Sequence, residues 1–210
     1  MSPGLRKLAL TVHVASSVGW LGGVACFLVL ALVGLNGRDS QTVSAVYIGM
    51  RLIGWYALVP GSIAGLTSGV VSSIGTEWGL FRHFWVFIKL LLTVGSTAML
   101  LLHMQLVSSL GQAAAAGMLA EGGALRAARS QIAVDAGLAL AVLVIITVLS
   151  VYKPWGLTPW ARRADSRMSV GPSLRRATAR PWGMYVLVGM AVFVLVVALV
   201  HLAGGGLHHH

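Results

Sequence analysis

The sequence predicts an all-α integral membrane protein, a bundle of five transmembrane helices with a four-helix core plus one. Hydrophobic residues make up 57% of the 210 residues and charged residues only 10%, whereas a soluble domain averages about 25% charged residues. The mean hydropathy is +0.86, and the apolar residues fall in runs comparable with the ~20 residues that span hydrocarbon. These observations predict a single transmembrane domain over residues 1–210.

Five apolar runs give the predicted spans in chain order: 6–35, 43–73, 84–107, 130–152 and 182–203. The first run has no A-x-A-like cleavage site at its end and is too long for a signal peptide, so it is predicted to be a retained span. In the second, Pro60 and Gly61 predict a kink, because proline removes one helical hydrogen bond. The Ala- and Gly-rich connection 108–129 is predicted to form a short interfacial helix. Residues 208–210 follow a glycine run and are interpreted as a purification-tag remnant.

The distribution of basic residues predicts the orientation of the spans. The formal net charge is +10, but the basic residues concentrate in loops beside apolar spans, which indicates contact with anionic lipid and no nucleic-acid partner. Ten of them fall on one predicted side: Arg6, Lys7, Arg82, Lys153, Arg162, Arg163, Arg167, Arg175, Arg176 and Arg180. Only Arg38, Arg126 and Arg129 fall on the other. The positive-inside rule therefore predicts an inner (plasma) membrane protein with a cytoplasmic N-terminus, an outer C-terminus and a lipid-contacting loop at 153–181.

Four ionisable side chains lie inside the predicted spans: His13, Arg51, Lys89 and His103. A charge at the bilayer centre costs roughly 2.5–3.5 kcal/mol on insertion scales, so such residues pair, bind a ligand or line a path. They are the primary candidates for a functional site.

The first span carries a polar face that suits a buried interface or a cofactor wall. His13, Ser16, Trp20 and Gly23 recur at helical spacing, and hydrocarbon would reject such a face. An isolated intramembrane histidine is also compatible with ordinary helix packing, and the two interpretations have equal weight for His13.

The second span carries a ridge of small residues formed by Gly61, Gly65 and Gly69. Such a ridge favours tight helix contact over ligand binding. Arg51 lies about two turns into this span. Asp135, near the start of the fourth span, is the acid at similar depth, so an Arg51–Asp135 ion pair is predicted.

The third span places candidate ligands at two depths. Lys89 and His103 share one face and lie about 21 Å apart along the helix at ~1.5 Å per residue. The same geometry places His13 near Lys89 and His201 near His103. We name these levels the inner layer (His13, Lys89) and the outer layer (His103, His201).

Three short motifs resemble a group of small bacterial membrane proteins. They are His13 followed after six residues by Trp20-Leu21-Gly22-Gly23, an arginine early in the second span, and Lys89-Leu90. The group includes the haem-associated membrane protoporphyrinogen oxidase family and the copper-resistance D-type membrane domain, and residues 8–105 carry the resemblance. The chain is most similar to uncharacterised actinobacterial-type members.

The resemblance implies that His13 is a haem ligand and that Arg51 and Lys89 match the group's arginine and lysine. The oxidase family has a different string, containing Phe and Tyr, after the first-span tryptophan. This chain also has a fifth span and a long basic loop, so the oxidase activity is not carried over.

Haem b binding with a redox or electron-transfer role is the leading functional prediction. The candidate cofactor-binding residues are His13, Trp20, Arg51, Lys89, His103 and His201, and His13, His103 and His201 are the candidate metal ligands. Haem would supply the chemistry, because the spans contain no paired carboxylates or nucleophile–base sets. A membrane oxidoreductase activity stays open, and the expected partner is a quinone or a redox protein.

Two alternatives remain. A copper-handling protein would use Met99, His103, Met104 and His201, which are soft or borderline donors, although the chain has no Met-x-x-Met cluster. A non-catalytic membrane partner or scaffold would use its polar residues only to join helices.

Overall fold

The computed structural model describes residues 2–74, 84–119 and 123–152, and these residues form helices and short links, with no strand among them. Four helical segments are long and apolar enough to cross a membrane: Pro3–Asn36, Ser40–Ser73, Trp85–Ala115 and Leu125–Tyr152. The all-α class is therefore confirmed, and a long apolar helix covers each of the first four predicted spans. The predicted fifth span, its residue His201 and the tag residues 208–210 lie outside the described residues.

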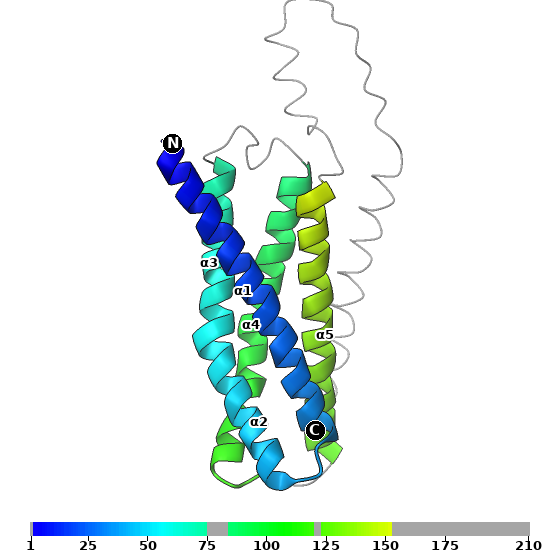
Figure 1. The fold of residues 1–210 in the computed structure, drawn as a ribbon. Helices are drawn as coiled ribbons and strands as arrows, with labels where there is room; N and C mark the ends of the chain where they lie inside the picture. Colours follow the sequence, from blue (N-terminus) through cyan, green and yellow to red (C-terminus); the bar gives the residue numbers. More distant parts are fainter. Residues whose placement is uncertain (1, 75–83, 120–122, 153–210) are drawn as a thin grey trace, which may run out of the picture.

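The described helices form an up-down-up-down bundle (Figure 1). They are α1 (Pro3–Asn36), α2 (Ser40–Ile53), α3 (Val59–Ile74), α4 (Phe84–Ala115) and α5 (Gly123–Tyr152). Helix α1 packs against α2, α3 and α5, and α4 packs against the same three helices. Short links between antiparallel neighbours favour this arrangement. We call the end that holds the N-terminus the N-terminal end, and the end that holds the α1–α2 and α4–α5 links the opposite end.

Polar caps define the first helix boundaries. Ser2 caps α1, since its hydroxyl accepts a hydrogen bond from the Leu5 amide at 3.4 Å, and Pro3 follows at a position where no helical amide is needed. At the opposite end, the Gly37 amide donates to the Val33 carbonyl at 2.8 Å. Asp39 then caps α2 by accepting a hydrogen bond from the Thr42 amide at 2.8 Å. The turn between α1 and α2 thus needs only three residues, 37–39.

The second span is interrupted by a π turn, η1 (Gly54–Leu58), where the sequence predicts a kink at Pro60. The Val59 amide bonds to the Gly54 carbonyl, five residues back. Proline at position 60 has no amide to donate and its ring crowds the preceding turn. The irregularity therefore falls on the N-terminal side of Pro60. Gly54 makes a close approach possible, because a Cβ there would lie 2.5 Å from the Met104 sulfur.

The link between the third and fourth spans is shorter than predicted. No separate interfacial helix is seen among the described residues of 108–129, because α4 continues to Ala115 and α5 begins at Gly123. The alanines at 113–115 have the highest helix propensity, so they extend α4 past the predicted end of the span. Gly117 follows with a φ of 68°, a left-handed conformation that favours glycine.

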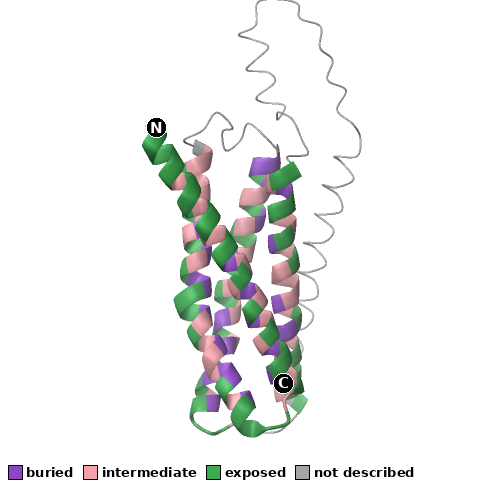
Figure 2. Ribbon diagram, in the orientation of Figure 1, coloured by how far each residue is buried: buried purple, intermediate pink, exposed green. Residues whose placement is uncertain are grey.

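Buried residues line the inside of the bundle (Figure 2). One apolar cluster includes residues from all the described helices, with Trp20, Phe27, Met50 and Met104 among its larger members. The first turns of α1 contribute little to it, and Leu5, Leu8 and Leu10 are each more than half exposed. Exposed apolar side chains are expected on a helix that faces lipid.

Candidate functional site

His13 lies in the contact between α1 and α3. Its Nδ1 atom is 3.2 Å from the Gly65 carbonyl oxygen and 3.2 Å from the Ser68 hydroxyl. Gly69 provides space for the ring, because a Cβ there would lie only 3.0 Å from the His13 Cε1 atom. The glycine ridge of α3 therefore receives the imidazole edge-on, which confirms the tight helix contact predicted for the ridge.

The contacts of His13 define which nitrogen carries the proton. The Gly65 carbonyl only accepts hydrogen bonds, and the Ser68 hydroxyl donates its own proton to the Ala64 carbonyl at 2.5 Å. Both neighbours of Nδ1 thus act as acceptors, so the Nδ1–H group donates. In the neutral imidazole the lone pair is then on Nε2, the nitrogen that a metal would bind.

Two buried polar atoms of α1 and α3 lack a hydrogen-bond partner among the described residues. Trp20 is 6% exposed and packs beside Gly61 and Gly65. Within the described part of the chain, its Nε1 atom has no hydrogen-bond acceptor, and the Ser72 hydroxyl on α3 has no partner either. Buried polar atoms are usually satisfied. Each of the two atoms could form one hydrogen bond with a water or a polar ligand group.

Lys89 belongs to the same level of the bundle as His13. It is half-buried on α4, and its Nζ atom lies 5.8 Å from the centre of the Trp85 ring. It is near enough to the His13 imidazole to interact with it electrostatically. The shared depth of His13 and Lys89 agrees with the helical rise, and their role as a ligand layer stays a prediction.

His103 is joined to Asp135 across the α4–α5 contact. Its Nε2 atom shares a hydrogen bond with the Asp135 carboxyl group, and its Nδ1 atom lies 2.9 Å from the Met99 carbonyl oxygen. The side chains of His103 and Asp135 are 12% and 14% exposed. The Nδ1–H group donates to the Met99 carbonyl oxygen. The hydrogen bond between Nε2 and the Asp135 carboxyl group then contains a further proton, which one of these two groups carries. Both ring nitrogens are therefore engaged, and neither has a lone pair left for a metal.

Arg51 does not pair with Asp135, so that prediction is wrong. Arg51 belongs to α2, which packs against α1 and α4, whereas Asp135 is on α5. The Arg51 side chain lies along α4: a Cβ at Gly111 would be 2.9 Å from the Arg51 Cβ and 3.0 Å from its Cδ. Depth alone could not distinguish a neighbouring helix from one diagonally across the bundle.

The donors predicted for copper are used in other contacts. Met104 is 1% exposed, and its sulfur packs against Gly54. Met99 contributes a carbonyl oxygen to His103. In residues 2–74, 84–119 and 123–152, no three His, Cys, Asp or Glu side chains come together. The outer layer in this part of the chain is a His–Asp pair.

The two layers are too far apart to share one cofactor ligand set. His13 contacts Gly69 of α3. Met104, the neighbour of His103 in sequence, contacts Gly54. The intervening 15 residues correspond to roughly 20 Å. Likewise, Gly111 beside Arg51 follows Lys89 on α4 by 22 residues, which is roughly 30 Å. Arg51 and Lys89 therefore cannot hold the two propionates of one haem.

Two partners of the candidate histidines, Ser68 and Asp135, were not predicted. The sequence does contain a signal for the His103–Asp135 pair: His103 precedes Leu119 by 16 residues, and Asp135 follows it by 16. Residues equidistant from the link of an antiparallel helix pair lie at the same level. Ser68 is adjacent to Gly69 in sequence, but nothing in the sequence alone directs its hydroxyl toward α1.

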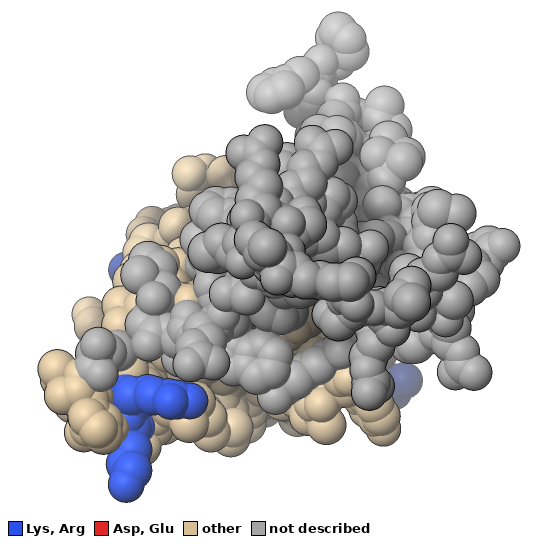
Figure 3. Space-filling model, turned by 90° about the horizontal axis from the view of Figure 1, so that it is seen from above, with Lys and Arg blue, Asp and Glu red and all other residues tan. Residues whose placement is uncertain are grey.

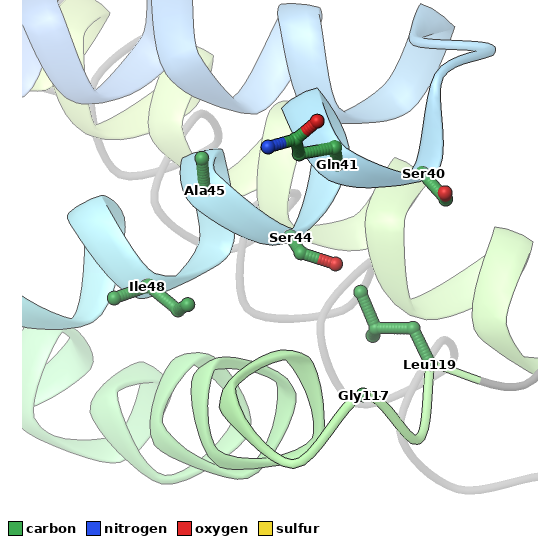
Figure 4. Close-up of a pocket in the computed structure, with 7 residues that line it drawn as sticks. All are labelled: Ser40, Gln41, Ser44, Ala45, Ile48, Gly117 and Leu119. Atoms are coloured by element: carbon green, nitrogen blue, oxygen red, sulfur yellow. The ribbon is translucent and has the colours of Figure 1, made fainter.

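A surface pocket of about 470 Å³ lies at the opposite end, between the start of α2 and the α4–α5 link (Figure 4). Its lining residues are Ser40, Gln41, Ser44, Ala45, Ile48, Gly117 and Leu119. They include hydroxyl and amide groups but no charged group and none of the candidate ligands.

Comparison of the chain with protein-family models, with curated proteins and with solved structures found no match. The functional argument therefore depends on the two layers. Of these, the inner layer contains the histidine, His13, whose Nε2 lone pair is not used by a hydrogen bond among the described residues.

Proposed function

We propose that the chain is an integral membrane protein that binds haem b through His13 and acts in electron transfer or membrane redox chemistry. The observation that carries the proposal is the pair of contacts that His13 Nδ1 makes, from which the tautomer is inferred. The Nδ1–H group is held by the Gly65 carbonyl and the Ser68 hydroxyl at 3.2 Å, so the Nε2 lone pair is free for iron. A hydrogen bond from the other ring nitrogen is the usual support of a histidine ligand.

Lys89 of the inner layer and Trp20 of α1 each have a role in this proposal. Lys89 would supply a cation for a propionate or for a quinone-like substrate, since it is half-buried in the part of α4 that the sequence places near the level of His13. The buried Trp20 Nε1 atom supplies a hydrogen-bond donor on the same helix. Haem itself would supply one-electron chemistry. A quinone or a redox protein in the membrane is the proposed partner.

The packing of the glycine ridge favours one competing function, a scaffold. His13 and Trp20 fill the ridge of α3 as ordinary interface residues do. Copper handling has less support, because the His103 nitrogens and the Met104 sulfur are already committed to other contacts.

The visible spectrum of protein expressed with ample haem tests the proposal. Wild type should show a Soret band, His13→Ala should lose it while remaining a folded helical protein, and His103→Ala should keep it. Exogenous imidazole should restore the band to His13→Gly, which a merely structural role would not predict. A colourless wild type would refute haem binding and favour the scaffold. Bound copper, measured by elemental analysis of the colourless protein, would favour copper handling.

We also propose that the N-terminal end faces the cytoplasm of a plasma-membrane protein. Seen from that end, the visible described surface has Lys and Arg atoms and no Asp or Glu atoms (Figure 3). The seven basic residues of 153–181 follow α5, which ends at the same side. An excess of basic residues on one side is typical of the cytoplasmic face.

A further inference from the structure

We propose that Tyr47 and Arg129 form a binding site for the phosphate of an anionic lipid headgroup at the opposite end of the bundle. The site is separate from the two histidine layers. It joins α2 to α5 across the end of α1.

Tyr47 contributes a buried hydroxyl group. The residue is 0% exposed, and its ring lies against α1 at Gly34, where a Cβ would be 2.9 Å from both the Tyr47 Cζ and hydroxyl oxygen atoms. Within the described residues, this hydroxyl has no hydrogen-bond partner. Leaving a buried hydroxyl unpaired destabilises the folded protein, so a ligand that pairs with this hydroxyl would stabilise the folded state.

Arg129 places a second donor and a positive charge over the ring of Tyr47. Its guanidinium carbon lies 5.6 Å from the centre of the Tyr47 ring. Its Nε atom is buried and, like the Tyr47 hydroxyl, has no acceptor among the residues that the structure describes. Charge-assisted hydrogen bonds to a phosphate are about 2.7–2.9 Å long. A phosphate oxygen would give each of these two donors the acceptor that it lacks.

The described carboxylates are engaged elsewhere. Asp39 caps α2 and Asp135 bonds to His103. The site thus contains two hydrogen-bond donors and one positive charge, and no carboxylate of the described residues pairs with them. An anionic ligand with oxygen atoms would supply both the acceptors and the negative charge. Arginine is the residue best suited to phosphate, because its planar guanidinium presents several donors.

The depth of the site favours a lipid as the source of the phosphate. Helix α1, with 34 residues, is about 51 Å long and exceeds the ~30 Å hydrocarbon core by about 10 Å at each end. Tyr47 follows the start of α2 by seven residues, and Arg129 follows the start of α5 by six. Both therefore lie about 10 Å from the helix ends, at the border between hydrocarbon and headgroups.

Thermal unfolding of delipidated full-length protein in detergent tests the site. Phosphatidylglycerol should raise the melting temperature of wild type, whereas diacylglycerol, which lacks the phosphate, should not. Tyr47→Phe should be at least as stable as wild type without lipid, because it removes an unpaired hydroxyl. With lipid, Tyr47→Phe and Arg129→Gln should each bind about tenfold more weakly, the loss expected for one charge-assisted hydrogen bond.

Two matched variants provide the controls. Tyr56→Phe changes a tyrosine that is 80% exposed, and Arg126→Gln changes an exposed arginine one turn before Arg129; both should respond to phosphatidylglycerol as wild type does. The proposal is overturned if wild type gains no stability, if diacylglycerol stabilises it equally, or if Tyr47→Phe keeps the full response. An equal gain from inorganic phosphate at the same concentration would show that the site takes a free anion and would overturn the lipid source.

Discussion

The His103 imidazole and the Asp135 carboxyl group share a hydrogen bond across the α4–α5 contact. Both side chains are largely buried, at 12% and 14% exposure. A lone charged side chain in the bilayer has a high free-energy cost. The hydrogen bond between the two side chains lowers this cost for both. The pair joins the two helices at the level of the outer layer.

A double-mutant cycle should measure this coupling. His103→Ala and Asp135→Ala should each destabilise the protein, and the double variant should cost about 1–2 kcal/mol less than their sum, because the second change removes a group already left unpaired. Unfolding in mixed micelles supplies the free energies. The matched cycle of Arg51→Ala with Asp135→Ala should be additive within about 0.5 kcal/mol. Strong coupling of Arg51 instead would restore the pairing predicted from sequence.

Close packing at Gly111 should make this position sensitive to one added methyl group. A Cβ there would lie 2.9 Å from the Arg51 Cβ and 3.0 Å from the Tyr47 carbonyl oxygen. Since the backbone cannot move aside cheaply, Gly111→Ala should destabilise the protein by about 1–3 kcal/mol.

Gly95 on the same helix provides the control, because a Cβ at Gly95 meets nothing within 4 Å. Gly95→Ala should be neutral or stabilising by up to about 1 kcal/mol, the helix-propensity difference. Equal effects of the two alanines on the unfolding free energy would contradict the α2–α4 packing.

The existence and order of the first four long helices and their polar faces could be predicted from the sequence, because they depend on local composition and periodicity. The end of α4 and the start of α5, by contrast, lie several residues from their predicted positions. The first four spans and the inner layer follow from apolar runs and from 1.5 Å of rise per residue. Lateral placement could not be predicted in the same way. Asp135 pairs with His103 of the neighbouring helix α4, whereas Arg51 lies on α2 beside Gly111, further along α4 toward the opposite end.

The π turn before Pro60 could not be predicted from the sequence either, because its form depends on contacts between helices. Proline predicts a disruption, but whether the helix bends or inserts a residue depends on the facing helix. Here Met104 of α4 occupies the space at Gly54. Tertiary contact, more than the proline alone, thus determines the form of the irregularity.

Stability at acid pH should depend on Asp39. The Thr42 hydroxyl and then the Thr42 amide donate to this carboxylate and lower its pKa from the ordinary value of 3.8. Because the folded pKa is depressed, the cap stabilises the protein fully above the unfolded value. Its contribution is lost as the pH falls through the folded pKa.

Asn is an equally good cap but does not titrate. The difference in melting temperature between wild type and Asp39→Asn should therefore be constant above about pH 5 and shift against wild type at lower pH. Asp39→Ala should be less stable than Asp39→Asn at every pH. A wild-type–Asn difference that does not change between pH 6 and pH 3 would mean that the carboxylate has no special role.

Orientation can be tested by labelling single cysteines in whole cells with an impermeant thiol reagent. The native Cys26 is exposed and is first replaced by alanine. Ala116→Cys, at the exposed end of α4, should be labelled, because the positive-inside rule places the opposite end outside the cell. Ser166→Cys, within the basic segment 153–181, should be protected until the cells are opened.

Gly205→Cys should be labelled in intact cells if 182–203 is a fifth span, since each span reverses the side of the chain that follows it. Labelling of Ser166→Cys with protection of Ala116→Cys would invert the proposed orientation, and protection of Gly205→Cys alongside Ser166→Cys would reduce the number of spans to four.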